Sequence, residues 1–280
     1  MANNPFKQER LDYAKFHKTA EKQALPFFRK ALAETIAPVL SWIENYGIIG
    51  VPVELLIKKN VWESTYQKVY EQVGVKSARR EYYYQRRIEG LESEDKASAI
   101  GLLIDVWSRT LRDYALRYTY QIQQELNDTT IEIINRALGE DYGLDIDRQG
   151  LVRLVLKNIK DKMKTRSLTI SRTESTTVSN LGKDIGARSW IDESGTGGYK
   201  LWLGRVVGER PSHLDVNNTI IPIDDEFIVG GEGAERPGDV RLSAKERINC
   251  RCTMSMMTGN RYNAYQKRGL IVNGKVTGAS

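Results

Sequence analysis

Hydrophobic positions recur every three or four residues through most of the first 190 residues, which is the spacing of amphipathic helices. The first such stretch covers residues 6–45, where Pro26, and again Pro38, is expected to break or kink the helix. A turn with glycine and proline follows at residues 46–52, and a second helical block covers residues 53–73. The chain therefore opens with several consecutive helices.

The longest uninterrupted helical pattern covers residues 93–126, with Ser93 as the predicted N-cap and acidic residues in its first turn. Asn127-Asp128-Thr129 is expected to end this helix and to cap a short one over residues 131–138. Gly139 is the predicted end of that short helix. A helix of this length suits an extended arm or a bundle.

Two further helices are predicted over residues 145–163 and 168–190. The second contains three polar residues near its start and middle, namely Arg172, Glu174 and Asn180. Taken alone, they are expected to form a solvated face, because charged residues usually occupy the exposed side of a surface helix.

After residue 195 the pattern changes from a helical period to short alternating segments, which is typical of strands. The predicted strands are Tyr199–Leu203, Thr219–Ile223, Glu226–Val229 and Ile248–Met256. The sequence therefore predicts an α+β fold, in which a long mainly helical N-terminal region precedes a small antiparallel-sheet module packed on a helix. The expected divisions are a helical arm over residues 1–166, the α+β module over 167–258 and a basic flexible tail over 259–280.

The charge is modestly basic, with 42 Lys and Arg against 36 Asp and Glu and a net charge of +6. Such a balance permits contact with phosphates or with an acidic protein surface. Two cysteines in 280 residues exclude a disulfide scaffold and indicate a reducing compartment. Residues 1–8 have no apolar core of a signal peptide, and no apolar run approaches the roughly 18 residues of a membrane span. We therefore expect no membrane anchor.

The most basic and aromatic stretch is residues 79–87, with Arg79, Arg80, Arg86 and Arg87 around three tyrosines. Arginine for phosphates and tyrosine for base stacking would suit DNA. The same two residue types are favoured at protein interfaces. Contact with a protein partner, contact with DNA and a plain surface therefore all remain open.

Cys250 and Cys252 are one residue apart, and His213 is one of only two histidines. Thiolate and imidazole ligands suit zinc, and three protein ligands with a water are the pattern of a catalytic zinc site. A fourth ligand would be water or one of four carboxylates: Asp215, Asp224, Asp225 or Asp239. The alternatives are a cysteine nucleophile with His213 as its base, or cysteines that share one face of a strand and pack as small apolar residues.

Several short motifs follow one another between Arg172 and Cys252. In order, they are Arg172-Thr173-Glu174 with Asn180, Lys200-Leu201-Trp202, Arg210-Pro211-Ser212-His213, Pro222, Phe227, Pro237-Gly238 and Asn249-Cys250-Arg251-Cys252. This ordered set resembles the phage head morphogenesis, or minor head protein, family (the phage Mu F-like group). The chain departs from the family at Val206-Val207-Gly208-Glu209, where Asp and then Arg are common, and no glycine follows Leu214-Asp215.

The resemblance implies a structural protein of a tailed phage, made in the host cytoplasm and located inside the head near the portal vertex. Its implied partners are the portal protein, other head proteins and packaged double-stranded DNA, with roles in head assembly and in DNA packaging or ejection. The two departures argue against an enzymatic site such as that of toxin-fused relatives, and no cofactor is expected. The alternative function is a zinc-dependent hydrolase or nuclease-like enzyme that uses His213, Cys250 and Cys252.

Overall fold

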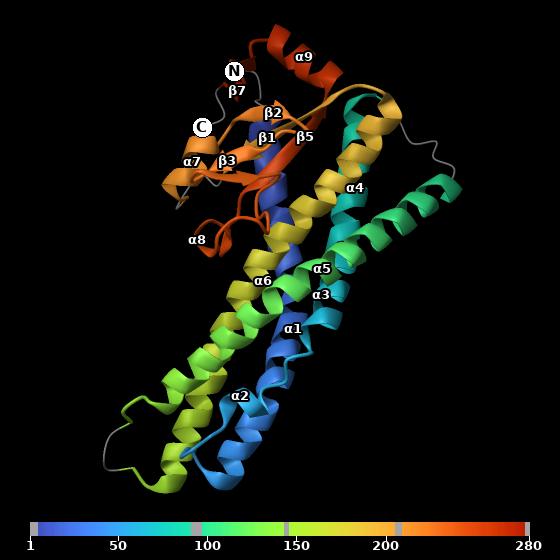
Figure 1. Cartoon of the computed structure of the whole chain (residues 1–280). Coiled ribbons are helices and arrows are strands. Elements are labelled where there is room, and N and C mark those ends of the chain that lie inside the picture. Colours follow the sequence, from blue (N-terminus) through green and yellow to red (C-terminus); the bar gives the residue numbers. More distant parts are fainter. Residues whose placement is uncertain (1–4, 91–96, 143–145, 205–208, 278–280) are drawn as a thin grey trace.

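A computed structural model describes residues 5–90, 97–142, 146–204 and 209–277. Long helices form an elongated body, and a small module of short strands and helices lies beside one end of it (Figure 1). The helices of the body are α1 (Pro5–Tyr46), α2 (Val53–Leu56), α3 (Trp62–Val69), the π-helical turn η1 (Tyr70–Gly74), α4 (Val75–Ile88), α5 (Ala97–Leu138) and α6 (Arg148–Ser194). No helix among these described residues is both long enough and apolar enough to cross a membrane.

The module follows α6 in the chain and is built on a three-stranded antiparallel sheet of order β2-β1-β5. Its elements are β1 (Gly198–Leu203), α7 (Pro211–Val216), β2 (Ile220–Pro222), β3 (Phe227–Val229), β4 (Glu232–Ala234), α8 (Ala244–Arg247), β5 (Thr253–Thr258), α9 (Gly259–Lys267), β6 (Ile271–Val272) and β7 (Lys275–Val276). The predicted α+β class is confirmed, with the helical region first and the small antiparallel module last.

Helix α1 continues through Pro26 and Pro38, so the predicted break is wrong. A proline inside a helix removes one backbone hydrogen bond and costs about 3 kcal/mol. Residues on both sides of Pro26, including Ala24 and Phe28, are buried in the main hydrophobic core. That packing holds the helix together across the proline. The second helical block is also different from the prediction, because residues 57–61 interrupt it and α4 extends it to Ile88.

Helix α5 continues through Asn127, where a break was predicted, and ends at Leu138 just before Gly139, as predicted. The Asn127 side chain is buried, and its Oδ1 accepts a hydrogen bond of 2.9 Å from Trp62 Nε1. A residue that usually favours turns is thus held in the helix by a tertiary partner. The predicted N-cap, Ser93, lies outside the described residues.

Helix α6 is a single helix of 47 residues, so the two helices predicted at 145–163 and 168–190 are one. The Asp147 side chain caps its start by accepting a hydrogen bond of 2.5 Å from the backbone N–H of Gly150. The predicted boundary between arm and module, at residues 166 and 167, falls inside this helix. Helix α6 therefore belongs to both the arm and the module.

Residues 259–276 fold as α9 and the β6–β7 hairpin, so the prediction of a flexible tail is wrong for these residues. Its residues pack on the N-terminal end of α1. The ring of Tyr265 lies edge-on to Phe6, with 5.3 Å between centroids, and Arg261 Nη2 lies 3.6 Å from Glu9 Oε2. The start of α1 and the segment after β5 thus pack against each other beside the sheet (Figure 1).

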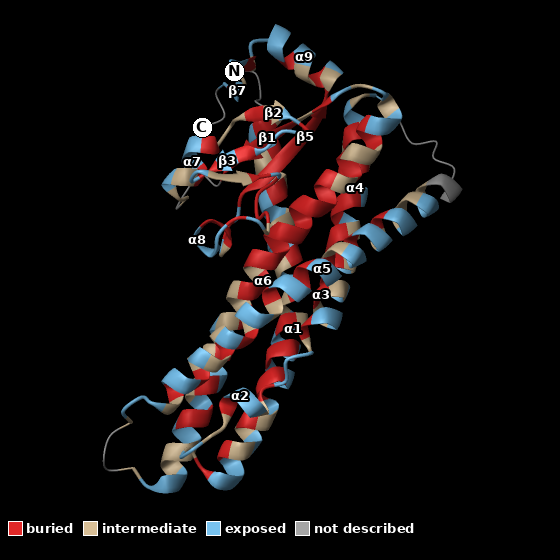
Figure 2. Cartoon of the chain, in the orientation of Figure 1, coloured by how far each residue is buried: buried red, intermediate tan, exposed pale blue. Residues whose placement is uncertain are grey.

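Helices α4 and α6 approach each other closely in the half of α6 that lies beside the sheet. A Cβ placed on Gly186 would overlap the backbone of Ala78, and one on Gly182 would overlap the backbone of Gly74. In this half, burial extends around nearly every face of α6 (Figure 2). The glycines permit this depth of packing because they have no side chain between the two backbones.

Candidate metal centre

The loop before β5 carries the two cysteines. Strand β5 begins only at Thr253, so the strand predicted from Ile248 was placed too early. Asn249 has a left-handed backbone, with φ of 58°, which asparagine tolerates better than most residues. Its N–H donates a hydrogen bond of 3.0 Å to Thr173 Oγ1 of α6. The turn buries Cys250 and Cys252 together and leaves Arg251 exposed. The prediction that the two cysteines share one side is therefore confirmed, although they lie in a turn and not in a strand.

His213 reaches the same place from α7. Pro211 occupies the first turn of this short helix, where a missing N–H is harmless. Arg210, just before the helix, donates hydrogen bonds to the carbonyl oxygens of Glu246 and Ile248. Arg210 therefore ties the start of α7 to the cysteine loop, and the Arg-Pro-Ser-His motif acts as a connector.

The three predicted ligands come together in the structure. Nδ1 of His213 lies 3.2 Å from Cys252 Sγ and 3.7 Å from Cys250 Sγ. All three ligand atoms lie within 4.8 Å of one another, and each side chain is buried. Both cysteines are free thiols. Three soft or borderline donors around one small volume are a donor set that zinc prefers.

Two carboxylates that sequence reasoning missed complete the surroundings of His213. Glu209 Oε1 lies 3.2 Å from Nδ1, on the side of the cysteines. Glu246 Oε2 lies 3.2 Å from Nε2, at an angle outside hydrogen-bond geometry, and also accepts a hydrogen bond of 2.7 Å from Ser212. Glu209 stands in the stretch that departs from the family pattern, of which residues 206–208 lie outside the described part.

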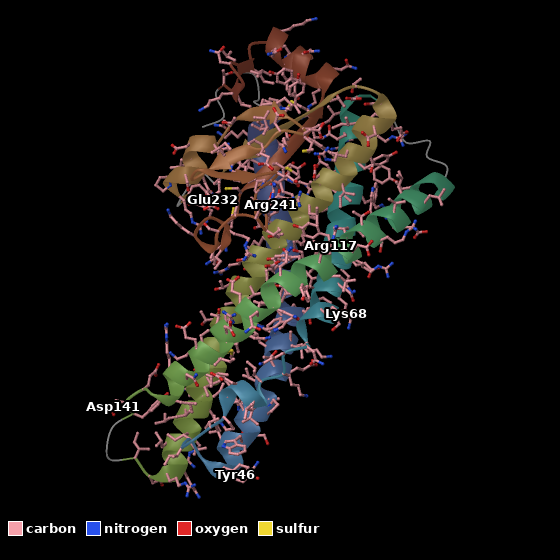
Figure 3. All side chains as sticks on the ribbon, viewed as in Figure 1. Tyr46, Lys68, Arg117, Asp141, Glu232 and Arg241 are labelled. Atoms are coloured by element: carbon pink, nitrogen blue, oxygen red, sulfur yellow. The ribbon has the colours of Figure 1, made fainter. Side chains whose placement is uncertain are left out.

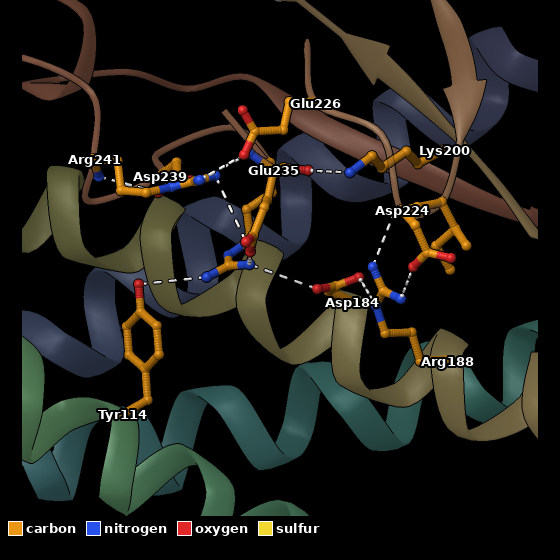
Figure 4. A network of polar contacts seen from close by, with 11 residues as sticks. Tyr114, Asp184, Arg188, Lys200, Asp224, Glu226, Glu235, Asp239 and Arg241 are labelled. Carbon is orange, nitrogen blue, oxygen red and sulfur yellow. Dashed lines mark hydrogen bonds and ion pairs between the residues drawn. The ribbon is translucent and has the colours of Figure 1, made fainter. Parts of the chain in front are cut away.

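The four carboxylates predicted as a fourth ligand lie elsewhere. Asp224 pairs with Arg188 at 2.7 Å, and Asp239 pairs with Arg241 at 2.8 Å (Figure 4). Asp215 and Asp225 are exposed to solvent. The prediction was wrong because candidates were chosen by residue type, while the fold decides which carboxylates reach His213.

The cluster is electrostatically coupled. Burial disfavours the imidazolium, but hydrogen bonds with Cys250 and Glu209 outweigh it and raise the pKa of His213 to about 10. A hydrogen bond from Cys252, helped by His213, lowers the pKa of Cys250 to about 6. Burial raises the pKa of Cys252. The raised pKa makes His213 an imidazolium at neutral pH, and its charge pairs with the thiolate of Cys250. An ion that binds at this place would displace the proton from Nδ1 of His213.

Asn180 of α6 fixes the cysteine loop from behind. Its Nδ2 donates hydrogen bonds of 3.1 Å to the carbonyl oxygens of Pro237 and Cys252. Its Oδ1 accepts hydrogen bonds of 3.1 Å from Thr253 Oγ1 and 3.3 Å from the backbone N–H of Met254. The predicted solvated face was wrong for this residue, because one buried amide joins α6, the Pro-Gly turn and β5.

Glu174 is buried as well, one and a half turns earlier in α6. It accepts hydrogen bonds of 3.1 Å from Tyr70 and 3.0 Å from Tyr118, and lies 3.7 Å from Arg247. Burial raises the pKa of Glu174, and the charge of Arg247 opposes that rise. Only Arg172 of the three predicted face residues is partly exposed, in an ion pair of 3.0 Å with Glu21.

Trp202 of β1 completes the motif set from the sheet side. Its ring packs edge-on against His213, with 5.8 Å between centroids, and against Phe227 at 5.2 Å. Trp202 and Phe227 belong to one small apolar cluster with Val229 and both cysteines. The family-motif residues from α6, β1, α7 and the cysteine loop thus surround a single place in the module.

The arginines of residues 79–87 lie on α4, apart from that place. The guanidinium groups of Arg79, Arg80 and Arg86 each lie over an aromatic ring of this chain, at 5.8, 4.9 and 5.5 Å from the ring centroids. Arg87 is exposed, whereas Tyr82 is buried. The patch therefore offers positive charge at the surface, but Tyr82 is not available to stack on a partner.

Resemblance of this chain to known proteins is sparse. No protein-family profile matches it, and no solved structure matches it. It is similar to the uncharacterized protein YqbB of Bacillus subtilis (strain 168), with 26% identity over 154 residues. That match covers 53% of this chain and 45% of the relative, so the chain corresponds to less than half of the relative's length.

Proposed function

We propose that this chain is a minor head protein of a tailed phage, which binds the portal protein inside the head and acts in assembly rather than catalysis. The observation that carries the proposal is the convergence of the ordered motifs. Arg210, Trp202, Asn180, His213 and the cysteine loop come from separate elements and make contacts with one another. If the motifs belong to one structural domain, as in the family that the chain resembles, their residues should contact one another in this way.

The arm supports a docking role. Its end far from the module carries exposed apolar side chains, with Ile49 92% exposed, Leu55 86% and Tyr46 64%. Tyr46 lies at one extremity of the molecule, and Glu232 and Arg241 of the module lie toward the other (Figure 3). Large apolar side chains exposed within one short stretch of the chain suit a surface that binds a protein partner. The portal is the partner that the motif resemblance implies.

The basic charge supports contact with packaged DNA. In addition to Arg79 and Arg87 on α4, a cleft between α1 and α6 contains Lys18, Lys22 and Arg251. Such contacts would be sequence-independent, because they are made by flexible cations with phosphates. They would suit a protein that lies beside the genome in the head.

A zinc-dependent hydrolase remains the alternative function. Its strongest support is the approach of His213 to both cysteines. The burial of all three side chains weighs against it, since a catalytic zinc keeps one position open to water and substrate. We therefore favour the structural function.

The test is co-expression of the full chain with the portal protein of the same phage, followed by size-exclusion chromatography. We expect the two proteins to elute together and the purified chain to lack hydrolase activity on nucleic acid and ester substrates. Separate elution, together with zinc-dependent hydrolysis that is lost in Cys250→Ser, would replace the proposal with the enzyme. A truncation before Leu168 is unsuitable here, because it would cut α6 in its middle.

A further inference from the structure

We propose that Cys250, Cys252, His213 and Glu209 form a closed structural zinc site, with Glu246 as the residue that orients the histidine ring. The proposal goes beyond the function in the head and does not depend on it. It differs from the catalytic reading of the same residues because it assigns the fourth coordination position to Glu209 instead of water.

The distances fit a tetrahedral ion. Zinc lies about 2.3 Å from sulfur and about 2.0 Å from nitrogen, so nitrogen and sulfur atoms bound to a tetrahedral ion stand about 3.5 Å apart. The two Nδ1–Sγ distances, 3.2 and 3.7 Å, bracket that separation. Nδ1 and Glu209 Oε1, at 3.2 Å, are near the separation of about 3.4 Å that the same bond lengths give for nitrogen and oxygen. Small side-chain shifts would therefore admit the ion.

The second nitrogen of His213 supports the same assignment. In zinc sites the ring nitrogen that does not bind metal usually donates to a carboxylate, which fixes the tautomer. Here Nε2 faces Glu246 Oε2 at 3.2 Å, and both groups are buried, but the angle lies outside hydrogen-bond geometry, so a small rotation of the ring would be needed to form that bond. Glu246 belongs to α8, and its carboxylate accepts a hydrogen bond of 2.7 Å from Ser212 Oγ. Nδ1 faces both cysteine sulfurs and Glu209, which is the side on which the ion would lie.

The buried position makes the site structural. His213 and Cys252 have no measurable exposed surface, and Cys250 is 2% exposed. The ligands come from the segment before α7, from α7 itself and from the loop before β5. An ion bound to them would link these segments, whose mutual contacts in the described chain otherwise consist of a small apolar cluster and a few hydrogen bonds.

The experiment uses the full chain purified from medium with added zinc. Elemental analysis should give about one zinc per chain, and removal by a chelator should lower the Tm by several degrees. Replacement by Co²⁺ should give thiolate-to-cobalt charge-transfer bands and the intense visible bands of a tetrahedral ion. A wild-type protein that binds well under one equivalent, or a cobalt form without thiolate bands, would overturn the proposal.

Variants separate the closed site from an open one. Glu209→Gln should weaken zinc binding at least tenfold, and Glu246→Gln should weaken it about 10–100-fold through the histidine. Asp215→Asn, a neighbouring exposed carboxylate on α7, is the matched control and should bind as the wild type does. If Glu209→Gln binds zinc as tightly as Asp215→Asn, Glu209 is not a ligand and the closed site is refuted. None of these measurements involves a phage component, so their failure is distinct from failure of the proposed function.

Discussion

The two halves of α6 are stabilised in different ways. In the arm half, the buried residues Val155, Ile159 and Met163 follow the helical period, and the opposite face is exposed. In the half beside the sheet, nearly every residue from Ser171 to Ala187 is buried, and many of them are polar. One continuous helix is therefore amphipathic at one end and surrounded by protein at the other.

The difference shows what allows a polar helix to be buried. A buried polar group without a partner costs about 1–3 kcal/mol. Most buried hydroxyls of this half have a hydrogen-bond partner, whereas Ser175 Oγ and Ser179 Oγ have none among the described residues. Thr176 Oγ1 donates to the carbonyl oxygen of Cys250 at 2.6 Å, and Thr177 Oγ1 donates to that of Gly238 at 2.9 Å. These hydrogen bonds fix the position of the module on α6. Apolar packing alone would fix that position less specifically.

Removing a buried charge from the polar half should have the largest effect. Glu174→Ala leaves Arg247 buried with one fewer ion pair, and we expect the free energy of unfolding to fall by about 3–5 kcal/mol. The matched control is Glu132→Ala, which breaks an exposed pair with Arg136 and should cost less than about 1 kcal/mol. Urea denaturation measures both. Equal costs for the two variants would refute the contrast between the halves.

A methyl group at the closest helix contact should have the next largest effect. Gly186→Ala forces α6 away from α4, and we expect a loss of about 1–3 kcal/mol. Gly101→Ala on α5 meets no atom within 4 Å and should stabilise the chain by about 0.5–1 kcal/mol. The two Tm shifts should therefore have opposite signs. A stabilising Gly186→Ala would contradict the close packing of this half.

Most of the architecture could be predicted from periodicity, whereas the continuity of the helices could not. Pro26, Asn127 and the residues near Ser167 are local breakers, and partners far away in the sequence overrule them. Asn127, for example, bonds Trp62 of α3. Sequence distance hides such partners, so propensity alone placed breaks where the structure has none.

Only part of the candidate site could be predicted from the sequence, because some of its residues are far apart along the chain. His213, Cys250 and Cys252 were recognisable by residue type and rarity. Glu209 and Glu246 cannot be distinguished by residue type, since they are two among 36 acidic residues. Only the turn of the chain into α7 and the position of α8 bring them to His213.

Neutralising the α4 arginines should change DNA binding without changing stability. In Arg79→Gln with Arg87→Gln, the slope of log affinity against log salt should fall by about 2, because each phosphate contact contributes about one unit. Lys157→Gln with Lys160→Gln, an exposed pair on the arm half of α6, is the charge-matched control and should leave the slope unchanged. Filter binding of DNA at several salt concentrations measures the slope of log affinity against log salt. Equal slopes for both double variants would remove α4 as the contact surface.

The most direct test of the account is portal binding by a chain altered only at the end of the arm. Ile49→Asp with Leu55→Asp changes two exposed side chains, so the Tm should stay within about 1–2 °C of the wild type. Size-exclusion chromatography with the portal protein should show loss of co-elution for this variant, while a Leu214→Asp control at an exposed position of the module still co-elutes. Retained binding by the arm variant and loss by Leu214→Asp would place the docking surface on the module and contradict the account.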